Sequence, residues 1–395
     1  MSRNMPSWKF LLGFVTAAGA LAAVFSASGL TQGTAKAEAL QEPYAGAALC
    51  LPDAAQTADC LAMGPVAKLA ELASLGIPVP DRGLPIYSPD RGLSNAPVFF
   101  AKINLDPSKA APIYATLDDA VAGQNIARYI PAGRLRFVSI MNQTRVDGVN
   151  YVELLSGEWM VADPASYSHF QGVQFRSAPQ GSIGWIVQPG LARTGPSYSY
   201  PQTGETLVQG TLVQIYDQKQ ASGTTWYMIG LDEWLERRYV HELTVDATPP
   251  AGVDNGRWIE VNLFDQTLTV YDHGQPVFAT LVSSGSKPFY TRPGLFKIYK
   301  KLEKDTMSGA FEPDRSDYYY LQDVPYVLYF DEARALHGTY WHTMFGYPTS
   351  HGCVNLPMGD AHWLYDWAHV GDWVYVVDPS GQTPTDPSYY GAGGA

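Results

Sequence analysis

The chain has 395 residues, of which 46% are hydrophobic, and a formal net charge of −12 at pH 7. This length and apolar content are enough for about two to four domains, each with a core of its own. The acidic balance argues against nucleic acid as a partner, because phosphate binding requires a basic face. The sequence contains no glycine-rich phosphate loop with a lysine, so no cofactor is predicted.

Residues 1–37 have the features of an export signal. Arg3 and Lys9 supply positive charge, residues 10–27 form an apolar run, and either Ala35-Lys36-Ala37 or Ala37-Glu38-Ala39 is a small-x-small cleavage site. The alternative is an uncleaved membrane anchor, because the apolar run approaches the ~20 residues that a bilayer span needs. In both cases the remaining chain is predicted to be exported, outside the cytoplasm.

The cysteines agree with export. Cys50 and Cys60 bracket a short loop, which suits a local disulfide in an oxidising compartment. Residues 61–75, rich in alanine and leucine, are predicted to form a helix, so that 40–95 is an N-terminal segment with a disulfide and a helix. Cys353 is left over, and an odd thiol in an exported protein points to a function.

Residues 97–245 contain a degenerate repeat. Gly148–Trp159 aligns with Gly223–Trp234 at an offset of 75 residues (223 minus 148). Alternating apolar positions between turn residues predict short antiparallel strands. The two units, 97–168 and 170–245, resemble small bacterial SH3-like β-barrels, and the sequence does not decide whether they are spacers or bind a wall polymer.

A Pro- and Gly-rich linker at 246–256 precedes the last folded segment, 257–378. Strands are predicted at 258–263, 266–271 and 373–377. Between them, four apolar residues at helical spacing predict a helix that Gly371 ends: Ala361, Leu364, Tyr365 and Ala368. From Pro379 the composition predicts a disordered tail, 379–395.

The stretch 336–356 places three histidines near one cysteine. A thiol is a strong nucleophile only as the thiolate, and we expect the nearby imidazoles to lower the pKa of Cys353. His337, 16 residues upstream (353 minus 337), is far enough away to lie on a neighbouring strand end as general base. Gly352 leaves the backbone uncrowded, so that peptide N–H groups can hold an oxyanion. One thiol without a closely spaced ligand pair disfavours zinc, and no metal is predicted.

His337-Gly338 followed by Ser350-His351-Gly352-Cys353 resembles the signature of the YkuD-type L,D-transpeptidases. Ser284-Gly285 and residues 291–296 fit the same pattern, and the resemblance covers 257–378. It implies a mainly β fold, in which a β-sandwich catalytic domain with one or two short helices follows the two SH3-like modules.

The resemblance implies peptidoglycan cross-linking of the 3→3 type. The Cys353 thiolate attacks the third residue of a donor stem tetrapeptide, D-alanine leaves, and an acceptor amine takes the thioester. The partners would be stem peptides and, as inhibitors, carbapenems. His337 would be the base, held by the Gly338 carbonyl, and the N–H groups of Gly352 and Cys353 would form the oxyanion hole beside His351.

The resemblance also implies substrate contacts. Ser350, Trp341 and Asn355 occupy positions that face the substrate in relatives, although Trp341 also fits a core position. In relatives a mobile hairpin covers the cleft, and here residues 297–323 would form it, with Tyr320 as a substrate contact. The alternative is that Tyr320 belongs to an aromatic face of a sheet. Many relatives carry arginine where Asn355 stands, and an amide cannot clamp a carboxylate as a guanidinium does.

Three other functions remain open from the sequence. Water in place of the amine would give an L,D-carboxypeptidase. An NlpC/P60-like cell-wall cysteine peptidase also combines SH3-like modules with cysteine and histidine, but there the cysteine precedes the histidine. A non-catalytic wall-binding protein is the third. The acceptor amine, the third stem residue and the oligomeric state are not predicted.

Overall fold

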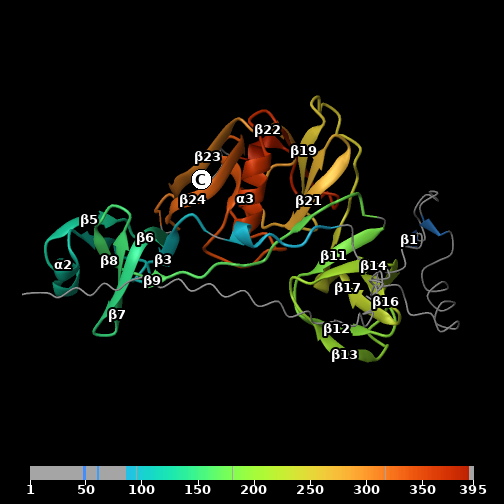
Figure 1. Ribbon diagram of the computed structural model, residues 1–395, viewed down its shortest axis with the longest axis horizontal. Coiled ribbons are helices and arrows are strands. Elements are labelled where there is room, and N and C mark those ends of the chain that lie inside the picture. Colours follow the sequence, from blue (N-terminus) through green and yellow to red (C-terminus); the bar gives the residue numbers. More distant parts are fainter. Residues whose placement is uncertain are drawn as a thin grey trace, which may run out of the picture. The chain divides into compact units, whose positions relative to one another are not determined.

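The computed structural model describes residues 48–49, 60–61, 86–94, 96–179, 181–315 and 317–390, and these ranges all fall in the same unit of the chain. The predicted export signal, Cys50 of the predicted disulfide and all of the predicted helix at 61–75 except Leu61 lie outside these ranges. In the described part no helix is long and apolar enough to cross a membrane. Strands predominate, which confirms the predicted mainly β fold (Figure 1).

The N-terminal part of the described chain is a β-rich segment with one short helix, α2 (Leu117–Ala122), capped by the Thr116 hydroxyl and by Gly123 at φ 65°. Two short strands and a 3₁₀ turn precede it: β1 (Ala48–Leu49), β2 (Cys60–Leu61) and η1 (Arg91–Ser94). Its strands are β3 (Phe99–Lys102), β4 (Ala111–Tyr114), β5 (Ile126–Ile130), β6 (Leu135–Val146), β7 (Val149–Leu154), β8 (Trp159–Val161) and β9 (Asp163–Pro164).

The middle part contains a three-stranded and a five-stranded sheet, with orders β14-β11-β18 and β13-β12-β17-β16-β15. Its elements are β10 (Val173–Gln174), β11 (Ser182–Ile186), β12 (Gly190–Arg193), β13 (Gln202–Leu207), β14 (Leu212–Ile215), β15 (Asp217–Ala221), β16 (Thr224–Gly230), β17 (Glu233–Glu236), η2 (Arg237–Tyr239) and β18 (Val240–Leu243).

The sequence repeat lies in two similar hairpins. β6 and β7 join through Asp147-Gly148, and β15 and β16 join through Ser222-Gly223; all four turn residues have positive φ. Two successive positive φ values suit the twist of a two-residue hairpin, which explains a glycine at the second position. Each hairpin is extended by an antiparallel strand that carries the aligned tryptophan, Trp159 or Trp234. The likeness to SH3 barrels stays a prediction.

The C-terminal part packs two sheets and one helix against one another. Its elements are β19 (Arg257–Asn262), β20 (Thr267–Asp272), β21 (Gln275–Leu281), β22 (Gly294–Lys297), β23 (Lys300–Gly309), β24 (Tyr319–Asp331), β25 (Arg334–Gly338), β26 (Val354–Leu356), α3 (Met358–Trp367), β27 (Trp373–Val377) and η3 (Pro387–Tyr389). Figure 1 shows α3 between the β23–β24 hairpin and strands β19 and β21. Ala361 and Leu364 of α3 share a core with Ile259 of one sheet and Leu328 of the other.

Both sheets of this part include strands from earlier in the chain. β10 extends the six-stranded sheet, β10-β21-β20-β19-β27-β22, and β6 pairs in parallel with β24 in the eleven-stranded sheet. Asp360 of α3 accepts the Gly172 N–H at 2.9 Å and a bond from the Thr280 hydroxyl. The sheets therefore continue across the boundaries predicted at 168 and 257.

The prediction of a disordered tail from Pro379 is wrong for residues 379–390. The Asp386 carboxylate accepts the Ser388 N–H at 2.9 Å and opens η3, and Asp378 accepts the Thr383 N–H at 2.7 Å. The Tyr390 ring lies 5.3 Å from the Arg334 guanidinium. The composition of this segment indicated a loop. The segment is ordered because its aspartates accept hydrogen bonds from turn N–H groups and because the Tyr390 ring packs against Arg334. Residues 391–395 lie outside the described chain.

Candidate active site

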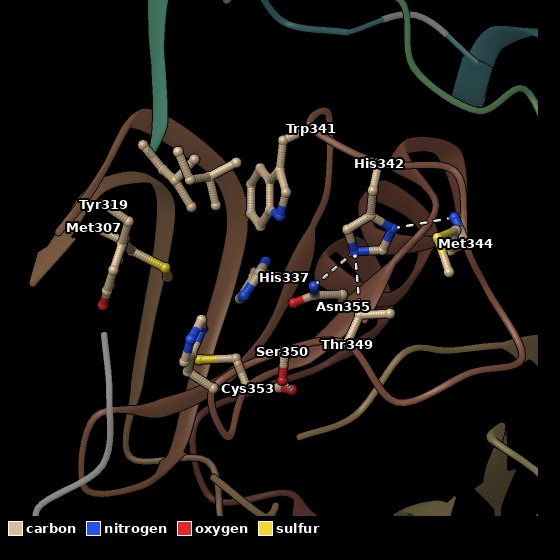
Figure 2. Close-up of a pocket in the computed structure, with 13 residues that line it drawn as sticks. Met307, Tyr319, His337, Trp341, His342, Met344, Thr349, Ser350, Cys353 and Asn355 are labelled. Carbon is tan, nitrogen blue, oxygen red and sulfur yellow. Dashed lines mark hydrogen bonds between the residues drawn. The ribbon is translucent and has the colours of Figure 1, made fainter. Parts of the chain in front are cut away.

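A pocket of about 170 Å³ opens where the β23–β24 hairpin faces the ends of β25 and β26 (Figure 2). It gathers most of the predicted site residues. It is lined by Leu135, Met307, Tyr319, Leu321, His337, Trp341, His342, Met344, Thr349, Ser350, His351, Cys353 and Asn355.

Parallel pairing of β25 with β26 brings the predicted base and nucleophile to one edge. Leu336 lies opposite Val354 and His337 opposite Asn355, so Cys353 immediately precedes the paired stretch. Figure 2 shows His337 between Trp341 and Cys353, and the rings of His337 and Trp341 are 5.6 Å apart. The spacing of 16 residues thus corresponds to a loop that returns the chain to the adjacent strand.

His337 has the tautomer and the neutral charge state that a general base requires. It is 2% exposed, and its Nδ1 donates to the Gly338 carbonyl at 3.1 Å, the contact expected from the sequence. A neutral imidazole with Nδ1 protonated leaves Nε2 as an acceptor. Burial lowers the pKa of His337 to about 4, so the ring is neutral near pH 7.

Cys353 does not have the lowered pKa that the sequence led us to expect. Burial raises the pKa of its thiol to about 11, against smaller lowering effects from a backbone N–H of Ala335 and the charge of Arg334. Burial also lowers the pKa values of His342 and His351, so these imidazoles carry no charge that would stabilise a thiolate. The sulfur must therefore lose its proton to a base as it attacks.

We expect alkylation of Cys353 by iodoacetamide to accelerate about tenfold per pH unit from pH 7 to pH 10. With a pKa raised to about 11, only about one thiol in ten thousand is ionised at pH 7, and the thiolate is the reactive form. Mass spectrometry of the Cys353 peptide measures the rate, and Cys353→Ser gives the background. A rate that levels off below pH 8 would contradict the raised pKa.

Ser350 and Gly352 hold the nucleophile loop together. The Ser350 hydroxyl donates to the Cys353 carbonyl and accepts the Gly352 N–H at 3.1 Å. Gly352 has φ +119°, and a Cβ there would lie 3.2 Å from Arg334 Nε. Because the Gly352 N–H is already bonded, its predicted role in an oxyanion hole is not supported. The Ser350 hydroxyl uses its proton within the loop, so it has no donor left for a substrate.

His351 belongs to an aromatic stack under the hairpin. Its ring lies 4.5 Å from Phe311 at an interplanar angle of 6°, and 6.1 Å from Tyr319 at 9°. Phe311 is in the loop between β23 and β24, and its N–H donates to Asp317 at 2.9 Å. His351 thus joins the nucleophile loop to the tip of the hairpin.

The hairpin predicted over 297–323 is present as β23 and β24, but Tyr320 does not line the pocket. Tyr319 and Leu321 do, whereas Tyr320 packs against the core of the N-terminal part. Successive side chains of a strand point to opposite faces, so Tyr320 faces away from the pocket and its predicted contact with the substrate is not supported.

Sequence reasoning missed several pocket residues, most of all Leu135. It belongs to β6 and reaches the pocket because it pairs with Tyr319 of β24. In the same region Phe100 stacks on Tyr340, with ring centroids 3.6 Å apart, next to Trp341. The sequence around Leu135 contains no pattern that predicts its contact with Tyr319, which is far away in the chain. His342, Met344 and Thr349, in contrast, lie within the stretch already singled out.

In the described residues no group of three or more His, Cys, Asp or Glu side chains is placed to hold a metal ion. What the fold and the pocket define is a thiol–imidazole site on a mainly β scaffold, with the base oriented by a backbone carbonyl. Residues 256–376 match the family model of the YkuD L,D-transpeptidase catalytic domain. This segment of the chain belongs to the YkuD family.

Several solved structures are similar to part of the chain. A mutant L,D-transpeptidase from Enterococcus faecium is 25% identical over 32% of this chain and 50% of its own, with a TM-score of 0.29. An L,D-transpeptidase from Stackebrandtia nassauensis is 31% identical over 33% and 58%, with a TM-score of 0.25. The E. faecium catalytic domain acylated by ertapenem is 28% identical over 31% and 96%, with a TM-score of 0.28. The match spans about half of the first of these proteins, and no curated protein matches the chain.

Proposed function

We propose that the chain is an exported L,D-transpeptidase that joins peptidoglycan stem peptides by 3→3 cross-links through a Cys353 thioester. The observation that carries this proposal is the pocket that holds both Cys353 and His337, whose Nδ1 is bonded to Gly338, within a YkuD domain. The substrate chemistry and the roles of Cys353 and His337 are those of the family, and their common pocket supports them.

In the proposed reaction, His337 Nε2 takes the thiol proton as the sulfur attacks the carbonyl of the third stem residue. The C–N bond to D-alanine then breaks, and the imidazolium returns the proton to the leaving amine. An acceptor amine attacks the thioester, its proton passes to His337, and the sulfur leaves and is reprotonated. The same imidazole thus acts in thioester formation and in thioester aminolysis. Because the pKa of His337 is low, its protonated form is a strong acid that can protonate the leaving amine.

The pocket walls favour an amine over water as the acceptor. Leu135, Met307, Leu321 and Trp341 are apolar, and they line the same pocket as Cys353. Such walls hold little water once a peptide is bound, so hydrolysis of the thioester is suppressed. This observation supports transpeptidation over the carboxypeptidase alternative.

We expect the purified protein to release D-alanine from a disaccharide-tetrapeptide and to form a cross-linked dimer, and Cys353→Ala to do neither. Mass spectrometry detects both products. Ertapenem should add its mass to the wild type and not to Cys353→Ala, because acylation requires the sulfur. His362→Leu, a change on α3 outside the pocket, should behave as wild type.

The other outcomes separate the alternatives. A hydrolysed monomer without dimer would support a carboxypeptidase. No mass change with either reagent would support a non-catalytic wall-binding protein. An identical result for Cys353→Ala and wild type would refute the thioester.

A further inference from the structure

His342 contacts Asn355 inside the pocket, and the hydrogen bonds around the two residues restrict where their protons lie. Asn355 Nδ2 is drawn 2.9 Å from His342 Nε2, and His342 Nδ1 accepts the Met344 N–H at 3.2 Å (Figure 2). A backbone N–H can only donate, so Nδ1 is unprotonated. A neutral imidazole then carries its proton on Nε2. Burial, which lowers the pKa of His342 to about 4, keeps the ring neutral.

Two N–H groups cannot hydrogen-bond to each other. The Asn355 amide therefore takes the orientation rotated by 180°, in which Oδ1 accepts the proton of His342 Nε2. The oxygen and nitrogen of an amide have nearly the same shape, so this rotation changes no packing. After the rotation, the amide atom that points away from His342 is a hydrogen-bond donor, N–H₂, where it was an acceptor oxygen.

The neighbouring hydroxyls agree with this proton arrangement. Ser283 Oγ donates to the Tyr347 carbonyl at 2.5 Å, so Thr349 Oγ1, 2.6 Å from Ser283 Oγ, donates to it. Thr349 Oγ1 is then an acceptor toward His342 Nε2 at 3.4 Å. The one Nε2 hydrogen then points to Asn355 Oδ1 at 2.9 Å and makes a weaker second contact with Thr349 Oγ1, which is consistent with the tautomer set by the Met344 N–H.

The rotated amide leaves the Asn355 N–H₂ without a partner. The atom in this position is buried and makes no hydrogen bond to any described residue. Asn355 is 2% exposed, and its backbone is fixed by reciprocal bonds with Ser283 at 2.9 and 3.0 Å, so the side chain cannot turn out to solvent. A buried donor of this kind costs free energy unless a ligand accepts its hydrogen bonds.

We propose that His342 is a positioning residue that holds the Asn355 N–H₂ toward the pocket, where it donates to a carbonyl oxygen of the bound peptide. A carbonyl suits the site better than a carboxylate, because none of the described residues that line it is lysine or arginine and most of its walls are apolar. The proposal rests on the proposed function for the identity of the peptide. It assigns this chain a neutral carbonyl contact where an arginine would clamp a carboxylate.

The first test is the position of the His342 proton. In ¹⁵N NMR of the full chain we expect the shift of a bare nitrogen at Nδ1 and of a protonated nitrogen at Nε2, with His342→Gln used to assign the signals. A proton on Nδ1 would overturn the proposal. This measurement needs no substrate, so it stands even if the protein fails to cross-link peptides.

The second test measures the rate of acylation by ertapenem, whose lactam carbonyl is the probe. Asn355→Asp replaces the outward donor by an acceptor, and His342→Leu releases the amide; each should slow acylation about tenfold to a hundredfold. His342→Gln, whose amide can again accept from Met344 and donate to Asn355, should recover most of the rate. In the Asn355→Asp background His342→Leu should add little, because both act through one contact.

His362→Leu is the matched control, and iodoacetamide labelling of Cys353 checks that the thiol is intact in every variant. A purely structural role of His342 would lower the melting temperature and both reaction rates together. Wild-type acylation rates in Asn355→Asp would overturn the proposed donor. Acylation by ertapenem without peptide cross-linking would refute the proposed function, but the acylation rates of the variants could still be compared with the wild-type rate. A wild type that ertapenem fails to acylate would overturn the carbonyl contact.

Discussion

Replacing His337 by glutamine should slow acylation of Cys353 at pH 7 by about 10²- to 10⁴-fold, the usual contribution of a general base. Glutamine is close in size to histidine and can donate to the Gly338 carbonyl, but it cannot take a proton. The effect is large because burial raises the pKa of the thiol to about 11, so almost no thiolate exists to react without a base. Single-turnover acylation by ertapenem, followed by intact mass, measures the loss.

The same variant has a characteristic pH dependence. As the pH rises toward 11 the thiol ionises by itself, so the difference between wild type and His337→Gln should shrink by about tenfold per pH unit above pH 7. Below pH 4 the wild type should lose its advantage, because His337 is then protonated. His362→Gln is the matched control. Equal rates at pH 7 would mean that a preformed thiolate exists and that His337 is not the base.

The arrangement of the catalytic strands was predictable from the sequence because it depends on local pattern. The predicted strand at 373–377 is β27, and the helix inferred from Ala361 and Leu364 is α3. The spacing of His337 and Cys353 indicated neighbouring strand ends, and β25 and β26 are paired there. The fixed number of residues between the two parts of the motif predicts this pairing, because the chain between them must form a loop that returns to the adjacent strand.

The corrections concern properties that local pattern does not determine. Which of Tyr319 and Tyr320 faces the pocket depends on the register of β24, and a shift of one residue exchanges the two faces. The pKa of Cys353 depends on its burial, which composition near the residue does not reveal. Leu135 reaches the pocket only through the pairing of β6 with β24, a contact that requires the complete fold.

The site also depends on a buried ion network behind Cys353. Arg334, 4% exposed, donates to Asp331 at 3.0 Å, and Arg292 Nε donates to the same carboxylate at 3.0 Å. Arg334 also borders the Gly352 backbone and lowers the pKa of Cys353 through its charge. It is therefore placed to affect both the stability of the nucleophile loop and the ionisation of the thiol.

Arg334→Met should destabilise the protein by about 3–5 kcal/mol, because removal of one partner leaves the buried Asp331 undercompensated. The melting temperature should fall by roughly 10 °C. In the folded fraction the pKa of Cys353 should rise further, so iodoacetamide labelling at pH 8 should be slower than in the wild type.

Arg128→Met, the control, breaks the more exposed ion pair with Glu158 and should lower the free energy of unfolding by no more than about 1 kcal/mol. Equal melting temperatures for the two variants would show that Asp331 does not depend on Arg334. Unchanged labelling would show that the Arg334 charge does not reach the sulfur.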